Sequence, residues 1–412
     1  MGDTFQFIRH LQFEDKGRAE ALLLIFMQET YPFDVVKVEL RPLAVSLNSF
    51  NGFMTLRDGT RLFFKTHTES DTLITEYYNA DLLAEAGYPI IKPIYKSQEI
   101  GKQILIYDLI EDRSVFDIAW DIENGRPAAP IIPAQYEADR TLVELYAKTL
   151  THQSLEEAAQ APIHQLFSHR LTAGRLDRFY GPMTRLILPQ PEPNLIRMAD
   201  VRQKHWVING QRYDETLNDL IRQAVDLLNP EQAGPAIIGH GDAHNGNVFF
   251  HPNDTPLTGE MVYFDPAFAG RHHPLLDLTK PLFHNVFAMW MYYPQEMKER
   301  TPITLREEDD TWHVEYDYPL PPIRQYIFDS KIKAALRPTL LLLKERDMLR
   351  EDWRRYLKAA LFCCPFLTMN LTDDTRFPPQ ISLLGLAMSV EMGGESHDKR
   401  SIIDTWLDDV TP

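Results

Sequence analysis

Alternating apolar and polar positions predict β-strands in the first quarter of the chain. Residues 35–40 and 52–56 are rich in β-branched or aromatic side chains and are bordered by turn-forming residues. The Asp-Gly pair at 58–59 predicts a tight turn into a third strand, residues 61–65. The apolar run at 103–110 predicts a further strand. We therefore expect a small antiparallel sheet here.

Apolar positions that recur every three or four residues predict helices around this sheet and throughout the rest of the chain. One helix is expected at 19–29 and another at 72–86, the second ending at Gly87. Beyond residue 113, helices are predicted at 134–151, 213–228, 329–345, 350–362 and 382–392, interrupted by an Asn-Gly hairpin at 206–213 and a short strand at 311–316. The pattern indicates an α+β protein with two lobes: a sheet-containing N-terminal lobe, residues 1–110, and a mainly helical C-terminal lobe, residues 111–412.

Charge and composition narrow the class of protein. Of 412 residues, 42 are basic and 59 are acidic, which gives a net charge of −17. A nucleic acid or an anionic membrane as partner calls for a basic surface, so neither is expected. The two cysteines are adjacent, Cys363 and Cys364, and do not suggest a structural disulfide. With no apparent targeting signal or membrane-length apolar run, we expect a cytoplasmic protein.

The segment from Gly239 to Asn247 is the most informative in the chain. It reads Gly-His-Gly-Asp-Ala-His-Asn-Gly-Asn, and a second apolar run then ends at Asp265. The residues between Asn247 and Asp265 predict a hairpin, which would bring both of them and Asp242 to one cleft. A carboxylate for a nucleophilic hydroxyl, together with an amide and a carboxylate that can hold magnesium, is what phosphoryl transfer requires.

This motif resembles the aminoglycoside phosphotransferase and choline kinase family, whose members are relatives of the protein kinases. Asn247 follows Asp242 by five residues and Asp265 follows it by 23, and residues 270–278 are similar to the segment that comes after the metal-binding Asp in that family. The resemblance implies a two-lobed, protein-kinase-like fold, with ATP and Mg²⁺ as cofactors. It implies Asp242 as the catalytic carboxylate and Asn247 and Asp265 as metal ligands. The chain departs from the protein kinases at Pro266, where they have Phe, so we do not expect their activation switch.

The nucleotide-binding residues are expected mainly in the N-terminal lobe. Lys65 ends an apolar strand, an unusual place for a lysine in a core, and the resemblance implies that it spans the ATP phosphates. Glu76, on the predicted helix that follows, is its expected partner. Ser49 lies in a polar loop, residues 46–52, whose backbone N–H groups could cradle the phosphates; an ordinary hairpin loop is equally consistent with that sequence.

Two more pairs of residues complete the expected site. The resemblance implies that the carbonyl of Asp108 and the N–H of Ile110 contact the adenine base. His240 is expected to brace the catalytic loop, and Asp277 to cap a helix and brace the same loop.

Some basic and histidine clusters are less specific. We interpret His272-His273 as part of a surface loop rather than a zinc site. Arg170, Arg175 and Arg178 either form a solvated helix face or contact an anionic part of the substrate.

The sequence favours an ATP-dependent kinase that phosphorylates a hydroxyl of a small molecule such as an amino sugar, an amino alcohol or a related metabolite or antibiotic. The alternative is a nucleotide-binding pseudokinase that acts as an interaction module. A protein kinase is disfavoured, because the expected Asp-Phe-Gly and Ala-Pro-Glu motifs are missing from the sequence. The acceptor, the choice between ATP and GTP and the oligomeric state stay open. The segments 113–235 and 282–412, rich in aromatic residues, either enclose the acceptor or only pack.

Overall fold

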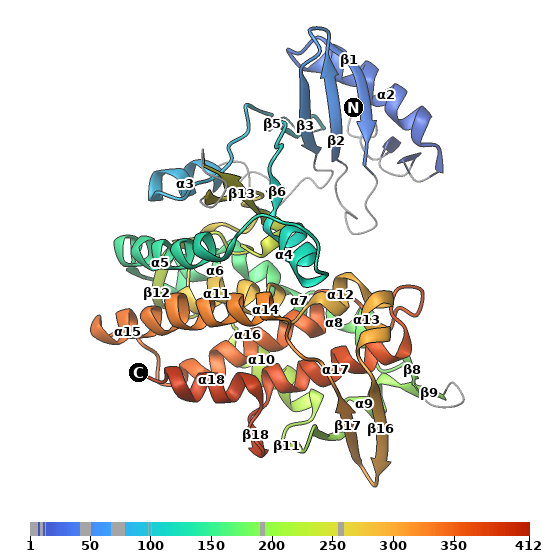
Figure 1. The fold of residues 1–412 in the computed structure, drawn as a ribbon, viewed down its shortest axis with the longest axis vertical. Helices are drawn as coiled ribbons and strands as arrows, with labels where there is room; N and C mark the ends of the chain where they lie inside the picture. The colour runs from blue at the N-terminus through green and yellow to red at the C-terminus, as the bar shows by residue number, and fades with distance from the viewer. Residues whose placement is uncertain are drawn as a thin grey trace. The chain divides into compact units, whose positions relative to one another are not determined.

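The computed structural model describes residues 7–8, 11–12, 14–41, 51–66, 79–97, 99, 101–189, 194–253 and 259–412. The chain forms two compact units, which are considered separately (Figure 1). Unit 1 comprises Met1–Arg113 and Val262–Ala267, and unit 2 comprises Ser114–Met261 and Phe268–Pro412. A short segment that follows the catalytic motif in the sequence therefore belongs to the N-terminal unit.

Unit 1 is built on an antiparallel sheet of five strands in the order β1-β2-β3-β5-β4. The strands are β1 (Val35–Leu40), β2 (Asn51–Leu56), β3 (Arg61–Thr66), β4 (Tyr95–Ser97) and β5 (Ile104–Asp108), and the helices are α2 (Lys16–Thr30) and α3 (Asn79–Ala86). Gly59 adopts a φ of +91° in the turn between β2 and β3, where the sequence predicts a hairpin. The side chain of Asp15 caps α2 by accepting a hydrogen bond from the Arg18 N–H.

The alternation that predicts the sheet also explains its core. Leu62 and Phe64 of β3 are buried with Ile104 and Ile106 of β5, and Leu23 is among the α2 residues packed into this cluster. Lys65 lies between the buried residues Phe64 and Thr66 in the sequence and so points to the other face of β3. The buried residues next to Lys65 in β3 therefore hold its main chain in place.

Unit 2 is mainly helical and carries several small sheets. Its helices are α4 (Val115–Glu123), α5 (Ile132–Thr149), α6 (Leu155–Ala159), η2 (Pro162–Leu166), α7 (Ser168–Thr172), α8 (Arg175–Tyr180), α9 (Met198–Val201), α10 (Leu217–Leu227), η3 (Asn245–Asn247), α11 (Pro274–His284), α12 (Met289–Tyr292), α13 (Pro294–Arg300), α14 (Pro322–Ser330), η4 (Lys331–Leu336), α15 (Arg337–Glu345), α16 (Trp353–Leu367), α17 (Pro379–Gly393) and α18 (Ile402–Val410). Helices α11, α16 and α17 are almost wholly buried, and α16 packs against both α11 and α17 (Figure 1).

The strands of unit 2 form a five-stranded sheet and smaller ones. They are β7 (Thr151–Gln153), β8 (Arg185–Leu188), β9 (Asn194–Arg197), β10 (His205–Ile208), β11 (Gln211–Tyr213), β12 (Gly234–Gly239), β13 (Val248–Pro252), β15 (Gly270–His272), β16 (Ile303–Glu308), β17 (Thr311–Tyr316) and β18 (Ser396–Asp398); β6 (Arg113–Ser114) and β14 (Gly259–Tyr263) span the unit boundaries. The larger sheet has the order β16-β17-β10-β11-β18. The expected Asn-Gly turn joins β10 to β11, with φ of 53° at Asn209 and 77° at Gly210. The antiparallel strands β15, β12 and β7 form the sheet from which the catalytic motif emerges.

The fold class predicted from the sequence, α+β with an antiparallel sheet followed by a mainly helical part, is confirmed. Element boundaries differ where local chemistry overrides periodicity. Helix α10 begins at Leu217 rather than at 213, because Thr216 and Asp219 form a capping box there. The helix predicted at 329–345 begins earlier, at Pro322, and passes through a π-helical turn. Within the described residues, no helix combines the length and the apolar character that crossing a membrane requires.

Candidate active site

The catalytic motif forms a tight loop that leaves β12 at Gly239 and enters β13 after the short helix η3. Two glycines are required for its path. Gly241 has a φ of +80°, and a Cβ there would lie 2.5 Å from the carbonyl oxygen of Phe268. A Cβ on Gly239 would lie 2.6 Å from Nε2 of His272. The glycines that flank His240 therefore allow the loop to pack against the segment after Asp265.

Asp277 in the first turn of α11 holds one side of the loop. Its Oδ1 accepts a hydrogen bond from the Gly241 N–H at 2.6 Å and lies 3.0 Å from Nε2 of His272, and its Oδ2 accepts from the hydroxyl of Tyr146. Burial would raise the pKa of Asp277, but these partners lower it below its usual value. The expectation that Asp277 caps the helix is wrong: His273 is the N-cap residue and accepts from the Leu275 N–H.

A second support holds the other side of the loop. The N–H of Asn245 donates to Oδ1 of Asn285 at 2.7 Å, just beyond the end of α11. The guanidinium of Arg324 donates to the Asn285 carbonyl at 3.0 Å and pairs with Glu123 at 2.9 Å, and the Arg324 side chain is fully buried. The loop is thus fixed through main-chain hydrogen bonds at Gly241 and Asn245, on both sides of Asp242.

Asp242 lies between these supports with one oxygen that is not hydrogen-bonded. Its Oδ1 is buried and makes no hydrogen bond with the described part of the chain. Nζ of the buried Lys280 lies 3.3 Å from Oδ1, close enough for an ion pair but without hydrogen-bond geometry, and Nε2 of His244 lies 4.0 Å away. The main-chain N–H of Asp242 donates to Nδ1 of the fully buried His240 at 3.3 Å.

Electrostatics keep this carboxylate ionised. Burial would raise the pKa of Asp242, but the charges of Lys280, His244, Arg170 and His240 together lower it below the usual value. An ionised, partly unsatisfied oxygen is available to accept a hydrogen bond from a hydroxyl group.

Asn247 is held beside Asp242 by its own side chain. Its Nδ2 donates to the main-chain carbonyl of Asp242 at 3.0 Å, and its N–H donates to the His244 carbonyl at 2.7 Å. These two hydrogen bonds fix the orientation of the side-chain amide, whose oxygen is a ligand suited to magnesium.

In unit 1, the structure brings Lys65 and Asp265 together. Nζ of Lys65 lies 2.6 Å from Oδ1 of Asp265, and both side chains are partly accessible. Asp265 adopts a φ of +55°, which is uncommon for a residue other than glycine and is typical of functional loops. The ring of Phe264 packs against Tyr107 at 5.0 Å, and Nδ2 of Asn79 donates to the Pro266 carbonyl at 3.0 Å. Contacts on both sides thus hold Asp265 in this conformation.

The other expected nucleotide-binding residues divide into two groups. Glu76 and Ser49 lie outside the described residues. Asp108 is the last residue of β5, opposite Leu62 of β3, and Ile110 follows in a short connection. Asp108 is exposed and Ile110 is partly exposed, at the end of a strand that lies between β3 and β4 in the sheet.

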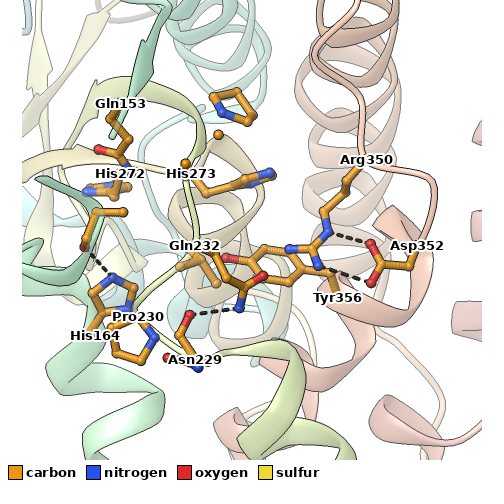
Figure 2. A pocket seen from close by; sticks show the side chains of 15 residues that line it. Gln153, His164, Asn229, Pro230, Gln232, His272, His273, Arg350, Asp352 and Tyr356 are labelled. Carbon is orange, nitrogen blue, oxygen red and sulfur yellow. Dashed lines mark hydrogen bonds and ion pairs between the residues drawn. The ribbon is translucent and has the colours of Figure 1, made fainter. Parts of the chain in front are cut away.

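A cavity of about 230 Å³ lies behind the loop in unit 2 (Figure 2). His272 and His273 line it together with His164, Arg350 and Tyr356. The interpretation of His272 as a surface-loop residue is wrong, because its side chain is 1 % exposed and contacts Asp277. Among the described residues, no group of three or more His, Cys, Asp or Glu side chains is placed to hold a metal. Asp242 does not line this cavity, so we place the proposed phosphoryl transfer at the loop that carries Asp242.

The sequence interpretation missed Lys280 and Asn285. Lys280 is a lysine within an otherwise apolar helix, and its buried position facing Asp242 becomes visible only in three dimensions. Asn285 follows the same helix and had no recognisable motif. For Lys280, a lysine among apolar residues of α11 was the available signal, whereas Asn285 offered none.

Comparison with known proteins identifies the family. The model of the phosphotransferase enzyme family, APH, matches residues 46–297, more than half of the chain and a range that includes Lys65, the catalytic motif and Asp277. The chain belongs to this family. The family that the sequence resembles and the predicted enzyme class, a phosphotransferase, are both confirmed. No curated protein sequence matches the chain.

Several solved structures are similar to this phosphotransferase. Amicoumacin kinase in complex with AMP-PNP, Ca²⁺ and amicoumacin is 14% identical, with a TM-score of 0.49 and coverage of 92% of this chain and 95% of the other. Spectinomycin phosphotransferase in complex with ADP and spectinomycin is 13% identical, with a TM-score of 0.41 and coverage of 90% and 98%. A microcompartment-associated aminopropanol kinase is 11% identical, with a TM-score of 0.41 and coverage of 90% and 95%.

Proposed function

We propose that this phosphotransferase transfers the γ-phosphate of ATP to a hydroxyl group of a small molecule, with Asp242 as the residue that receives the hydroxyl proton. The observation that carries the proposal is the buried Oδ1 of Asp242, which is ionised, makes no hydrogen bond to the described residues and is held on a braced loop in a chain of the phosphotransferase family. The hydroxyl of the acceptor would donate to this oxygen and be oriented for attack.

The lowered pKa of Asp242 fits this role. In a loose phosphoryl-transfer transition state the hydroxyl loses its proton late, so orientation matters more than basicity. A carboxylate that stays ionised is ready to orient the hydroxyl at any pH above its own lowered pKa. Acidification from neutral pH to about pH 5 therefore leaves Asp242 in its working form.

We propose Asn247 and Asp265 as magnesium ligands and Lys65 as a nucleotide contact from the chemistry of their side chains. Asn247 supplies an amide oxygen and Asp265 a carboxylate, both hard oxygen ligands of the kind that magnesium prefers. When bound, the ion would neutralise charge on the phosphates. Lys65 would bind the phosphates of ATP with its ammonium group, and Asp265 would also hold Lys65 in position. Asp108 and Ile110 would offer main-chain groups to the base, with Glu76 and Ser49 as further nucleotide contacts.

The segments 113–235 and 282–412 contain aromatic residues that could enclose the acceptor. The side chains of Tyr180, Trp206 and Trp290 are fully buried and belong to the packed interior. Tyr293 stacks on Trp120 with ring centroids 4.0 Å apart, and Tyr292 contacts His284 near the catalytic loop. We therefore propose that Tyr292 borders the acceptor, whereas the buried rings serve packing.

The proposal is tested by measuring ADP release with a panel of hydroxyl-bearing acceptors, with the phosphorylated product confirmed by mass. Wild-type protein should form product with at least one acceptor, and Asp242→Asn should lower kcat by about two to four orders of magnitude. Binding of ATP with magnesium, followed as thermal stabilisation, should persist in Asp242→Asn. A protein that binds ATP but phosphorylates nothing, with the same ADP release in Asp242→Asn, would instead support the pseudokinase alternative.

A further inference from the structure

Around Asp242, unit 2 concentrates positive charge although the chain as a whole is acidic. Lys280 lies 3.3 Å from Oδ1 of Asp242 with its side chain only 5 % exposed. His244 lies 4.0 Å from the same oxygen, and its ring is 5.9 Å from that of His284. The groups that act electrostatically on Asp242 include Lys280, His244 and Arg170, all of which favour a negative neighbour.

A chain of contacts leads from His284 to Arg170. Nδ1 of His284 lies 2.8 Å from the Tyr292 hydroxyl, and Nε2 lies 3.5 Å from Oγ1 of Thr368. The same Oγ1 accepts a hydrogen bond from the Arg170 guanidinium at 3.4 Å. Burial lowers the pKa of His284 well below its usual value, so this histidine is neutral and does not compete for an anion. Arg170 is thus the cation that ends this row of side chains.

Two guanidinium groups in this region have unused donors. Nε of Arg170 and Nε of Arg376 are both buried without an acceptor in the described part of the chain. Both charges act on the Tyr292 hydroxyl, whose pKa is raised first by burial and then by Asp242, and both oppose that rise. A buried donor of a charged group that lacks an acceptor is costly to keep, so each one indicates a missing acceptor.

The neighbouring arginines do not share this property. Arg175 donates to the Leu367 carbonyl at 3.2 Å, and the guanidinium of Arg178 is exposed and lies over the ring of Phe179 at 5.4 Å. The basic cluster seen in the sequence therefore separates into a solvated part, Arg178, and a part directed to the interior, Arg170.

We infer that the acceptor is a hydroxyl compound that also carries an oxyanion, a carboxylate or a phosphate ester, and that Arg170 binds this group while Asp242 binds the hydroxyl. The inference rests on the proposed function and refines it, because it favours acids over the amino sugars and amino alcohols that the sequence left open. An ammonium group near Arg170 would add a third positive charge to a region whose carboxylate is already paired with Lys280. An oxyanion supplies the acceptor that the Nε–H of Arg170 lacks.

The test compares acceptors of opposite charge on one carbon skeleton. D-gluconate and D-glucose 6-phosphate represent carboxylate and phosphate, D-glucosamine represents the amine, and wider panels of hydroxy acids, sugar phosphates and amino alcohols extend each arm. Turnover should be confined to the acidic arms, and the preferred arm identifies carboxylate or phosphate. In Arg170→Gln, KM for the best acid should rise about tenfold to a hundredfold with little change in kcat. Arg178→Gln removes the same charge from the same segment and should leave both constants unchanged.

Efficient phosphorylation of amines, with KM unaffected by Arg170→Gln, would overturn the inference and leave the proposed kinase function intact. A second arm does not depend on turnover: calorimetric binding of inorganic sulfate in the presence of saturating ATP analogue and magnesium. Sulfate should bind the wild type and the Arg178→Gln variant, and binding should weaken about tenfold or more in Arg170→Gln. Equal sulfate binding by all three proteins would contradict the role of Arg170 whether or not any acceptor is phosphorylated.

Discussion

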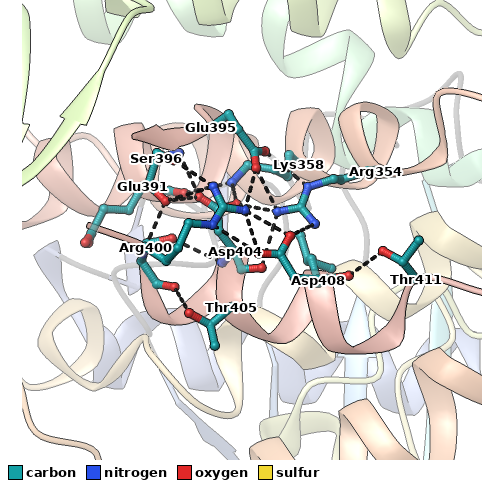
Figure 3. A network of polar contacts seen from close by, with 12 residues as sticks. Arg354, Lys358, Glu391, Glu395, Ser396, Arg400, Asp404, Thr405, Asp408 and Thr411 are labelled. Carbon is teal, nitrogen blue, oxygen red and sulfur yellow. Dashed lines mark hydrogen bonds and ion pairs between the residues drawn. The ribbon is translucent and has the colours of Figure 1, made fainter. Parts of the chain in front are cut away.

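Two carboxylates in unit 2, Asp242 and Asp404, each have an oxygen next to a buried lysine, yet they differ in one respect. Oδ1 of Asp404 pairs with Lys358 and with Arg354, and Oδ2 accepts hydrogen bonds from the N–H of Ser396 at 2.8 Å and from its hydroxyl at 2.6 Å (Figure 3). Oδ1 of Asp242 makes no hydrogen bond to the described residues. Both carboxylates are held ionised, because burial would raise the pKa of each but nearby cations and donors lower it.

This comparison indicates that burial and charge pairing alone do not mark an active site. A carboxylate whose hydrogen-bonding capacity is used by its neighbours stabilises the fold, as Asp404 does by joining α16, β18 and α18. A carboxylate with unused capacity on a braced loop has been left available for a ligand. The two sites therefore predict opposite responses to the same kind of mutation.

The largest effect is expected from removing the metal ligand proposed in unit 1. Asp265→Ala should lower kcat/KM by about three orders of magnitude, since it removes both the proposed magnesium ligand and the partner of Lys65. The fold of the protein should persist, because Asp265 is partly exposed in a short connection. Steady-state kinetics and thermal unfolding measure the two quantities. Near-normal turnover in Asp265→Ala would remove this residue from the metal site.

The next largest effect is expected on the free energy of unfolding when Asp404 is changed, because both of its carboxylate oxygens have partners. Asp404→Asn leaves Lys358 buried beside a neutral group and should lower the free energy of unfolding by about 3 kcal/mol. The kcat of the folded fraction should be unchanged. Denaturant unfolding and turnover at low temperature test this. A variant that is fully stable but inactive would contradict the structural role of Asp404.

A smaller effect is expected from the lysine beside the catalytic carboxylate. Lys280→Met should lower kcat by about tenfold to a hundredfold, because the positive charge beside Asp242, which favours its ionised form, is lost. The loss of unfolding free energy should be smaller than in Lys358→Met, because that substitution leaves Asp404 buried without its closest cation. Parallel unfolding curves of the two variants make the comparison. A larger stability loss in Lys280→Met would assign Lys280 to the fold instead.

The smallest effect is a pH dependence near Asp404. Burial raises the pKa of Glu391 to about 7, although the hydroxyl of Tyr316 and the charge of Lys358 oppose the rise. The folded protein thus keeps this proton at pH values where the unfolded chain has released it, and its contribution to stability is lost as pH rises through 7. The free energy of unfolding should therefore fall between about pH 5 and pH 8 in the wild type, and in Glu391→Gln this fall should be smaller by on the order of 1 kcal/mol. An identical pH profile in the variant would show that Glu391 ionises normally.

The sequence was most informative where local chemistry decides the structure. The Asp-Gly turn at 58–59, the Asn-Gly turn at 209–210 and the strand at 311–316 lie where they were predicted, because glycine conformations and β-branched alternation are local properties. The catalytic motif was recognisable because the spacing of Asp242, Asn247 and Asp265 is similar to that of a known family.

What the sequence could not supply depends on contacts between distant segments. Lys280 and Asn285 reach the catalytic loop only because α11 packs beneath it, and Arg170 approaches the same region from a segment about 70 residues earlier in the chain. His272 seemed exposed because two histidines in a turn-rich segment gave no sign that one of them is buried against Asp277. The roles assigned to Asp242, Asn247, Lys65 and Asp265 stay predictions until they are measured.

The most direct test of the central claim measures Asp242→Asn and Asp404→Asn together, recording kcat and the free energy of unfolding for each. We predict that Asp242→Asn loses two to four orders of magnitude in kcat, as expected for a positioned proton acceptor, while its stability is unchanged or increased because a buried, unsatisfied oxygen is neutralised. Asp404→Asn should show the reverse pattern. If Asp242→Asn is instead strongly destabilised while its folded fraction keeps wild-type kcat, Asp242 is a structural residue and the account of the active site is wrong.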